Sequence, residues 1–315
     1  MRLMTKVSCS LIMCLALGSV ALAAKNDEDR FAPLKRFSQV MDLVENHYVK
    51  PVTRNELIDG AIVGMLQQLD PHSSFLSKDE FKEMQVSTSG EFGGIGIEIS
   101  MENGRLTVIS PIDDTPADKA GVKAGDVILE IEGESTQDMT LVDAVQKIRG
   151  PKGKPVSLTL IHKDQQKPFK VKVVRDTIPI ISVKSNEVEP GYLYVRLSRF
   201  NENTTTELRQ GLADYKKSGK PLKGVILDLR NNPGGLLEQA VNVSDVFLPS
   251  GQIVSIKGKN ADQEKVFSAK GDGSDVSVPL VVLINAGSAS ASEIVAGALK
   301  DHKRALLVGE KTFGK

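Results

Sequence analysis

The hydrophobic pattern of this chain changes its period twice, and no other feature limits the possible folds more strongly. Apolar residues recur at helical spacing up to about residue 85, alternate as in strands from Gly90, and form alternating strand-like and helix-like segments from Tyr192. One hydrophobic core rarely serves 315 residues. We therefore expect a multidomain α+β protein with a helical domain over 31–85, a mainly β module over 88–175 and an α/β domain over 176–315.

The helical part is expected to contain two helices. The first carries apolar residues at helical spacing as far as Tyr48, and Pro51 ends it. The second starts at Thr53, which stands three residues before Glu56 as in a capping box, and its apolar face continues to Leu69. These patterns predict a small helical domain.

Glycines introduce the β module. The segment Gly93–Ile99 alternates like a strand entered through a glycine loop, and Asn103-Gly104 has the sequence of a hairpin turn. Leu141, Val145 and Ile148 form a helical stripe. Further strands are expected over 106–109, 127–131, 156–161 and 169–174, followed by a connector over 178–183.

In the third part, strands alternate with helices. Strands are expected over 192–197, 225–229, 280–284 and 305–308, and helices over 208–215, 236–247 and 292–299. Such alternation is typical of a largely parallel sheet covered by helices. The sequence stops at Lys315 without a closing helix, so we interpret it as a fragment of a longer protein.

The first residues read as a secretory signal peptide over 1–23. Arg2 and Lys6 precede the short apolar run 7–17, and Ala21-Leu22-Ala23 is a small-x-small cleavage site. An uncleaved anchor is the alternative, but the apolar run is short for one. Cleavage removes both cysteines of the chain, so we expect no disulfide and no cysteine-ligated metal.

Charge and composition exclude further classes. The 40 basic residues balance the 40 acidic ones, and the predicted cleavage leaves 38 against 40, a net charge of −2. Since nucleic-acid binding proteins carry a basic excess, we expect no nucleic-acid partner. The four histidines are scattered without zinc spacing, so we expect no metal. No apolar run of 18 residues follows residue 24, so no membrane span is expected in the mature chain.

One motif resembles a phosphate-binding loop. Gly309–Lys315 follows a strand and matches that pattern up to its lysine. However, the loop comes late in the fold, the required Ser or Thr would lie after Lys315, and an exported protein generally lacks nucleotide. We therefore expect no nucleotide and no other cofactor.

Two loops follow strands of the predicted sheet, both at the edge formed by the carboxyl ends of those strands. Gly287–Glu293 contains Ser290 at the start of a helix, where free N–H groups favour an oxyanion. Ser290 and Glu293 also have the spacing of a capping box, so Ser290 could simply cap the helix. The second loop, Asn232–Gly235, is either a ligand-binding loop or an ordinary turn. Because sites form beyond the carboxyl ends of parallel strands, the two loops together favour a shared site over a site at one loop alone.

Residues 31–315 resemble the carboxyl-terminal processing peptidases, serine endopeptidases with an embedded PDZ domain. The motifs that carry this resemblance are spread over the chain: Leu69–Ser73, Gly93–Gly96, Thr115–Gly121, Gly125–Ile128, Asp228–Gly235, Ser288–Glu293 and Gly309–Lys315. The resemblance implies a catalytic α/β domain similar to that of crotonases and Clp proteases, here incomplete at its C-terminal side.

The same resemblance assigns roles to residues of the α/β domain. It implies Ser290 as nucleophile, Lys315 as general base, and the N–H groups of Ala291 and of Gly234 or Gly235 as oxyanion donors. A lysine base needs a lowered pKa, usually through burial, which the Gly309–Lys315 loop could supply. The family places a glutamine four residues later, beyond this sequence, so we expect residues 24–315 alone to be inactive.

The β module is implied to bind the free C-terminus of a protein. A terminal carboxylate would meet backbone N–H groups of Gly93, Gly94, Ile95 and Gly96, and the tail would lie beside Ile97 and a helix carrying Leu141 and Val145. The alternative is that Leu141 and Val145 only fill the core. Arg149 follows that helix, where it either contacts the peptidase part or lies in a solvated turn.

These features together predict an exported serine endopeptidase, periplasmic or associated with the cell envelope, that recognises protein tails and cleaves them with a Ser–Lys pair. Its partners would be proteins with free, apolar C-termini. A homo-oligomer and an accessory lipoprotein or adaptor remain open. The alternative function is an inactive, PDZ-bearing adaptor or regulator.

Overall fold

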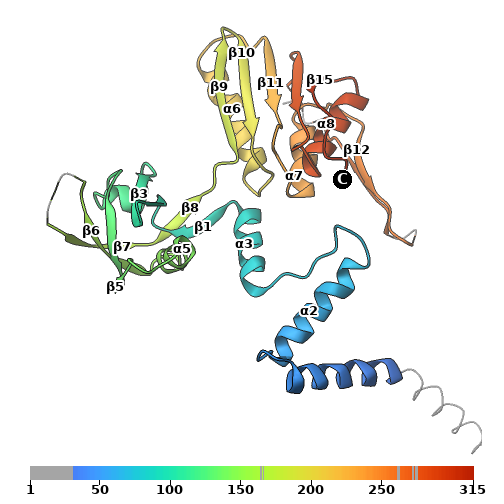
Figure 1. Ribbon diagram of the computed structural model, residues 1–315. Helices are drawn as coiled ribbons and strands as arrows, with labels where there is room; N and C mark the ends of the chain where they lie inside the picture. The colour runs from blue at the N-terminus through green and yellow to red at the C-terminus, as the bar shows by residue number, and fades with distance from the viewer. Residues whose placement is uncertain (1–30, 164, 166, 261–262, 272, 274–275) are drawn as a thin grey trace, which may run out of the picture. The chain divides into compact units, whose positions relative to one another are not determined.

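The computed structural model describes residues 31–315 except 164, 166, 261, 262, 272, 274 and 275 (Figure 1). The predicted signal peptide over 1–23 lies outside this range. The chain divides into two compact units, Met1–Asp79 and Glu80–Lys315.

The first unit is helical, as predicted. Residues 31–47 form one helix and α2 spans Arg54–Gln67. The capping box is confirmed, since Thr53 Oγ1 accepts the Glu56 N–H at 3.3 Å and Glu56 Oε2 accepts the Thr53 N–H at 2.7 Å. However, no residue of α2 is buried. Within the described residues the predicted apolar face is only partly covered, with Leu57, Ile58 and Ile62 half-buried.

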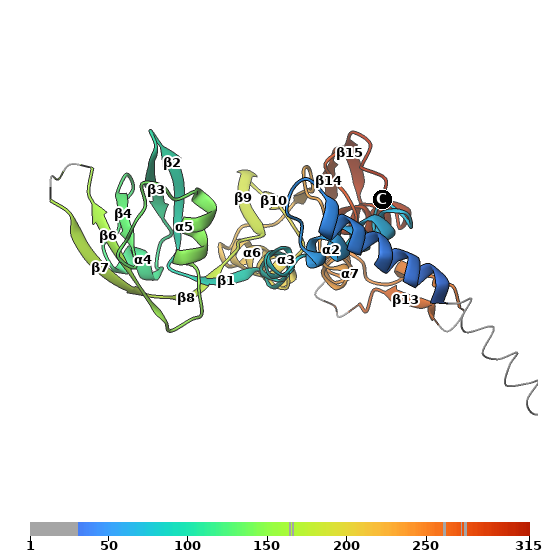
Figure 2. The same ribbon diagram turned by 60° about the horizontal axis from the view of Figure 1, so that its bottom comes forward.

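The β module belongs to the second unit and follows α3 (Lys78–Ser89). Its sheet has the order β2-β3-β4-β6-β7, and β5 pairs with β4. In Figure 2, α5 lies beside β2, and the two elements are in contact. The predicted hairpin turn is confirmed, with Asn103 and Gly104 at φ 51° and 75°. The bounds are β2 (Ile97–Glu102), β3 (Arg105–Pro111), α4 (Pro116–Lys119), β4 (Val127–Ile131), β5 (Glu134–Ser135), α5 (Leu141–Ile148), β6 (Pro155–Ile161) and β7 (Phe169–Val174).

The connector predicted over 178–183 is shorter in the structure, where residues 180–182 join two strands. The predicted range overlaps β8 (Asp176–Pro179), which pairs antiparallel with β1 (Glu91–Gly94), and the start of β9 (Val183–Glu189). Both strands escape the sequence pattern for physical reasons. β8 is four residues long, and β9 is an edge strand in which only Val183 is buried, so its remaining residues show no apolar alternation.

The α/β domain contains the predicted parallel sheet. The order is β15-β14-β11-β10-β9, in which β10, β11, β14 and β15 are parallel and β9 is antiparallel to β10. Three helices pack in a row, α6 against α7 and α7 against α8. The bounds are β10 (Tyr192–Leu197), α6 (Thr204–Lys217), β11 (Gly224–Asp228), α7 (Leu237–Asp245), β14 (Leu280–Ile284), α8 (Ala291–Asp301) and β15 (Leu306–Gly309).

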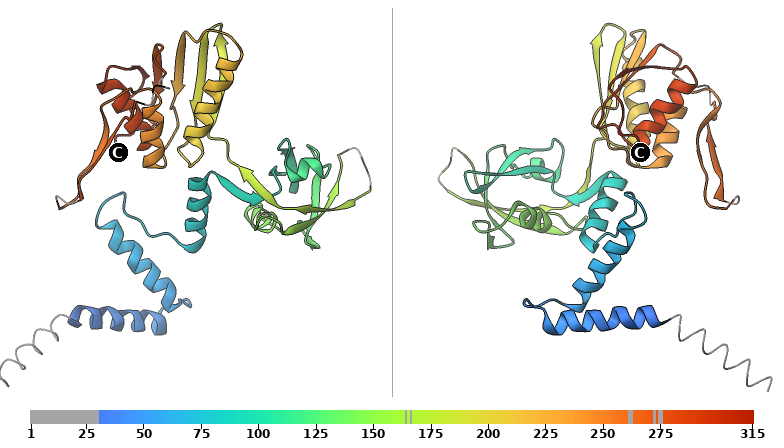
Figure 3. Two further views of the ribbon diagram at one scale, coloured as in Figure 1. Left: turned by 180° about the vertical axis from the view of Figure 1, so that it is seen from behind. Right: turned by 45° about the vertical axis from the view of Figure 1, so that its right-hand side comes forward.

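A two-stranded ribbon, β12 (Gln252–Ile256) with β13 (Lys265–Ser268), was not predicted. Figure 3 shows it extending away from the five-stranded sheet. The feature that positions the site is the pairing of β11 with β14, which aligns Asp228 with Leu283. Since the two strands are parallel, the loops that follow them leave the same edge of the sheet.

Candidate active site

Ser290 occupies a strained turn between β14 and α8. It is the residue before the first helical residue, Ala291, and its backbone has φ 54° and ψ −113°. Ordinary N-cap residues have extended backbone angles, as Thr53 and Thr140 do in this chain. A non-glycine residue at such angles costs about 1–3 kcal/mol and persists where the surroundings hold it, often at functional sites. The capping box that the sequence suggests is present, since Glu293 accepts the Ser290 N–H at 2.8 Å. The strain adds a reason for a functional role that a simple cap does not explain.

The two neighbouring serines are structural. Ser288 and Ser292 are fully buried. Ser288 Oγ donates to the Leu229 carbonyl at 2.8 Å, and Ser292 Oγ donates to the Asn232 carbonyl at 2.9 Å. Ser290 is only partly buried. Of the three serines, it is the one that a substrate can reach.

The two predicted loops meet at Ser290. A Cβ atom on Gly234, whose φ is 103°, would lie 2.9 Å from both Ser290 Cβ and Ala291 N. The Ala289 N–H also donates to the Asn232 carbonyl at 3.0 Å. Only glycine allows this close approach, so the second loop is built to lie against the serine turn.

The backbone donors beside Ser290 differ in availability. The Gly234 N–H donates to Asn232 Oδ1 at 2.9 Å. The N–H groups of Gly235 and Ala291 donate to no atom of the described residues. Phe200 holds Gly235 in place, since its N–H donates to the Gly234 carbonyl at 3.0 Å and its carbonyl accepts the Leu236 N–H at 2.8 Å. Of the two glycines, therefore, only Gly235 has a free N–H group, as Ala291 does on the other loop.

The Gly309–Lys315 loop is tied to the start of α8 by one carboxylate. Glu293 Oε1 accepts from Thr312 Oγ1 at 2.8 Å and from the Gly314 N–H at 2.7 Å. Glu293 Oε2 accepts from the Ser290 N–H at 2.8 Å and from the Lys315 N–H at 3.2 Å. A single oxygen atom therefore joins the backbones of the predicted nucleophile and the predicted base.

The side chain of Lys315 is exposed. The described residues therefore do not supply the burial that we expected from its loop. Glu293, in contrast, is held as an anion. Burial raises its pKa, but hydrogen bonds from Thr312, Gly314, Ser290 and Lys315 outweigh this effect and keep the pKa of Glu293 below its usual value. Sequence reasoning considered Glu293 only as a capping partner and missed this role.

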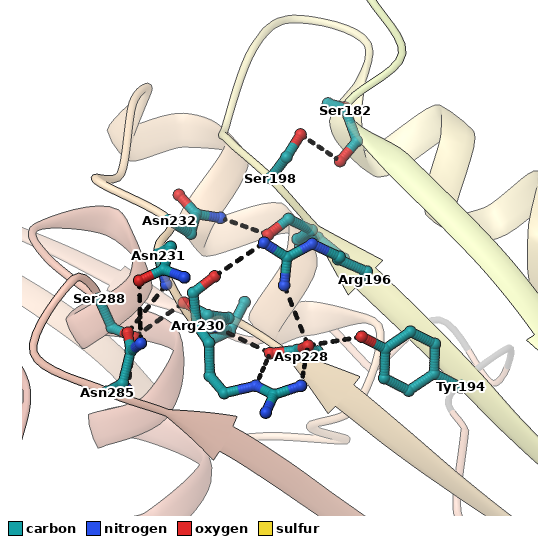
Figure 4. Close-up of polar contacts among 12 residues, drawn as sticks. Ser182, Tyr194, Arg196, Ser198, Asp228, Arg230, Asn231, Asn232, Asn285 and Ser288 are labelled. Atoms are coloured by element: carbon teal, nitrogen blue, oxygen red, sulfur yellow. Dashed lines mark hydrogen bonds and ion pairs between the residues drawn. The ribbon is translucent and has the colours of Figure 1, made fainter. Parts of the chain in front are cut away.

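Another carboxylate, Asp228, is fully buried and fixes the start of the glycine loop (Figure 4). It accepts from Tyr194 Oη at 2.5 Å, from Arg196 at 3.0 Å and from Arg230 at 2.8 and 2.9 Å. Burial raises the pKa of Asp228, but the bonds from Arg230 and Tyr194 prevail and hold it well below the usual range. Arg196 also donates to the Arg230 carbonyl at 3.1 Å. This network was not predicted, because Tyr194 and Arg196 come from the neighbouring strand β10.

Most, but not all, of the predicted tail-binding residues line one hollow. A hollow between β2 and α5 is lined by five of them, Gly94, Ile95, Gly96, Ile97 and Val145, and also by Phe92, Ile99, Ile148 and Arg149. The N–H groups of Ile95 and Gly96 donate to no described residue. Val145 is not part of the core cluster, which contradicts the core-only alternative for it.

Two of the predicted tail-binding residues do not line this hollow. Leu141 is 37% exposed, away from the core. Gly93 instead packs on the turn after α5, where a Cβ would come 2.1 Å from the Gly150 carbonyl oxygen.

Arg149 is not simply solvated. It forms an ion pair with Glu83 of α3 at 2.9 Å, and its guanidinium lies 4.5 Å from the centre of the Phe92 ring.

Within the ranges that the structure describes, no three His, Cys, Asp or Glu side chains come together in a way that could hold a metal ion. In those same ranges, no helix has the length and apolar character needed to cross a membrane.

The structure defines an α/β protein that carries a separate β module, and comparison with known proteins specifies its class. Residues 191–315 match peptidase family S41, 93–173 match the PDZ domain, and 16–80 match the activating protease CtpB N-terminal domain. The chain is 47% identical over 298 residues to a carboxy-terminal-processing protease of Bartonella bacilliformis, covering 94% of this chain and 68% of the relative. It is 35% identical to carboxy-terminal processing protease CtpA of Bacillus subtilis, covering 98% of this chain and 66% of the relative.

Among solved structures, the photosystem II D1 C-terminal processing protease matches with a TM-score of 0.45 and 32% identity, covering 89% of this chain and 81% of that one. The chain belongs to the carboxy-terminal processing proteases of peptidase family S41. It spans about two thirds of the length of the two curated relatives named above.

Proposed function

We propose that the full-length protein is a serine endopeptidase that cleaves proteins whose C-terminal tails are held in the PDZ hollow. The observation that carries this proposal is the strained Ser290 turn, next to which Ala291 has an unpaired N–H group, together with the unpaired N–H group of Gly235 on the loop that approaches the turn at Gly234. Free backbone donors beside a nucleophile can stabilise the oxyanion of acyl transfer.

In this proposal Ser290 Oγ attacks the scissile carbonyl carbon while the neutral Lys315 amine takes the hydroxyl proton. The carbonyl oxygen becomes an oxyanion, which the N–H groups of Gly235 and Ala291 bind. The C–N bond then breaks, and the Lys315 ammonium returns the proton to the leaving amine. Water releases the acyl group from Ser290 by the same steps, and Lys315 again accepts and returns a proton.

Lys315 can act in this way only if it is held neutral near Ser290. Its exposed side chain supports the inference that further sequence, such as the relatives possess, must bury it. We therefore expect residues 24–315 alone to be inactive, and the full-length protein to degrade unfolded casein. The assay compares both proteins at matched concentration, with the full-length Ser290→Ala variant as the blank. Comparable turnover by residues 24–315 would remove Lys315 from the proposed mechanism.

The PDZ hollow is proposed to bind a free carboxylate through the N–H groups of Ile95 and Gly96, with the apolar end of the tail against Val145 and Ile148. Charge-assisted hydrogen bonds are about twice as strong as neutral ones. Amidation of a tail peptide should therefore weaken its binding about tenfold or more, measured by calorimetric titration. Equal affinity for the acid and the amide would contradict this mode of recognition.

We also propose that the protein is exported and acts in the periplasm or at the cell envelope. This rests on the charged, apolar and small-residue pattern of residues 1–23. The partners are proteins with free, apolar C-termini, and a second copy or an accessory lipoprotein or adaptor is compatible with this role. The rival function, an inactive adaptor, would retain the PDZ hollow but gains nothing from a strained Ser290.

A further inference from the structure

Two asparagines join the site loops on the solvent side. Asn231 follows β11 and Asn285 follows β14. Asn285 Oδ1 accepts the Asn231 N–H at 2.9 Å, and Asn285 Nδ2 donates to Asn231 Oδ1 at 2.9 Å (Figure 4). Asn285 Oδ1 also accepts the Gly287 N–H at 3.1 Å. Because this oxygen accepts two backbone donors, the other amide atom of Asn285 must be the NH₂ group, which fixes the pairing.

The backbone of Asn231 is shaped for this pairing. Its φ is 55°, a left-handed conformation that asparagine tolerates better than most residues. The approach of the loops is also close, since a Cβ on Gly287 would lie 2.7 Å from Asn231 Oδ1. The pair is therefore a built contact between the two loops.

A separate set of bonds holds the same loops on the buried side. The carbonyl of Asn232, which is fully buried, accepts both the Ala289 N–H and Ser292 Oγ. Ser288 Oγ adds a further inner bond, to the Leu229 carbonyl at 2.8 Å. These inner bonds hold the loops on one side only, and the outer Asn231–Asn285 pair adds an attachment on the solvent side, so that attachments on both sides fix the angle between the loops.

We propose that Asn231 and Asn285 are positioning residues that set the distance between the oxyanion donors Gly235 and Ala291. This inference rests on the proposed peptidase function. Gly235 lies four residues after Asn231 on one loop, and Ala291 lies six residues after Asn285 on the other. A misplacement of about 1 Å in such a site can lower the rate about 100-fold.

The test uses the full-length protein and the variants Asn231→Ala, Asn285→Ala and the double variant. Titration with a fluorophosphonate counts the protein molecules whose serine reacts. Cleavage of a tail peptide then gives KM, and kcat per reactive site. We expect kcat to fall about 10- to 100-fold with KM changed less than about threefold. Because both residues serve one contact, the double variant should be no slower than Asn285→Ala.

Asn186→Ala is the matched control, since Asn186 is exposed on β9 and its side chain makes no hydrogen bond to the described residues. If Asn231 and Asn285 only stabilised the fold, their replacement would lower the melting temperature and the number of reactive sites but leave kcat per reactive site unchanged. That result, or a double variant whose loss is the product of the two single losses, would overturn the proposal. A wild-type protein that neither cleaves nor labels would instead refute the peptidase function on which the proposal rests.

Discussion

Replacement of Ser290 by alanine in the full-length protein is expected to lower peptide-bond cleavage by about 10⁴-fold or more, as removal of a catalytic serine does. Folding should survive, because loss of an N-cap side chain costs about 0.5–2 kcal/mol. The backbone bonds of the turn, including the Ser290 N–H to Glu293, do not depend on the hydroxyl. Casein turnover and the thermal midpoint, measured on the same preparation, separate the two effects.

Ser288→Ala and Ser292→Ala are the matched controls for this experiment. Each removes a buried hydroxyl that donates to a carbonyl group, so each should lower stability by about 1–3 kcal/mol. The folded fraction of each control should still cleave. Undiminished cleavage by Ser290→Ala, or complete loss in a stably folded control, would mean that another serine is the nucleophile.

The second large effect is expected for Glu293→Gln. Four donors converge on the two carboxylate oxygens, two on each. Glutamine has the same shape but must direct its NH₂ group at two of these donors. The Lys315 loop or the Ser290 turn then loses bonds to Glu293, although the Phe313 N–H still donates to the Ser288 carbonyl and the Ala289 N–H to the Asn232 carbonyl. We expect the resulting shift to lower kcat about 100-fold, as for other displacements of about 1 Å.

The pH dependence of stability tests the same carboxylate. The pKa of Glu293 is lower in the folded protein than in the unfolded chain. Ionised Glu293 therefore stabilises the fold fully when the pH is above the pKa of the unfolded chain. This stabilisation is lost as the pH falls through the lower pKa of the folded protein. Glu293→Gln should therefore flatten the acid decline in the thermal midpoint. Glu238→Gln, which changes an exposed glutamate in the first turn of α7, is the control. Equal activity of the two variants would show that Glu293 does not position the site.

The sequence predicted those parts of the fold that depend on local patterns. The parallel strands were recognisable because burial makes them continuous apolar runs, as in Leu280–Ile284. The strands β8, β9, β12 and β13 were missed because they are short or lie at edges, where one face or both are polar.

For the candidate site as well, the sequence predicted the features that depend on local patterns. Ser290 and the glycine loop could be predicted from their positions at the carboxyl ends of strands, and the PDZ hollow from its glycines. The Asp228 network could not, because Tyr194 and Arg196 lie more than thirty residues earlier in the chain. Nor could sequence decide between Gly234 and Gly235, since the choice depends on which N–H group Asn232 takes.

The most direct measurement is the site of modification by a fluorophosphonate, which forms a stable adduct with an activated serine. The full-length protein is incubated with the reagent, digested and analysed by mass spectrometry, with the Ser290→Ala variant in parallel. We predict one adduct, on Ser290, and none in the variant. An adduct on another serine, or no adduct on a folded wild-type protein that binds tail peptides, would contradict the proposed catalytic site, and the second result would indicate an inactive adaptor.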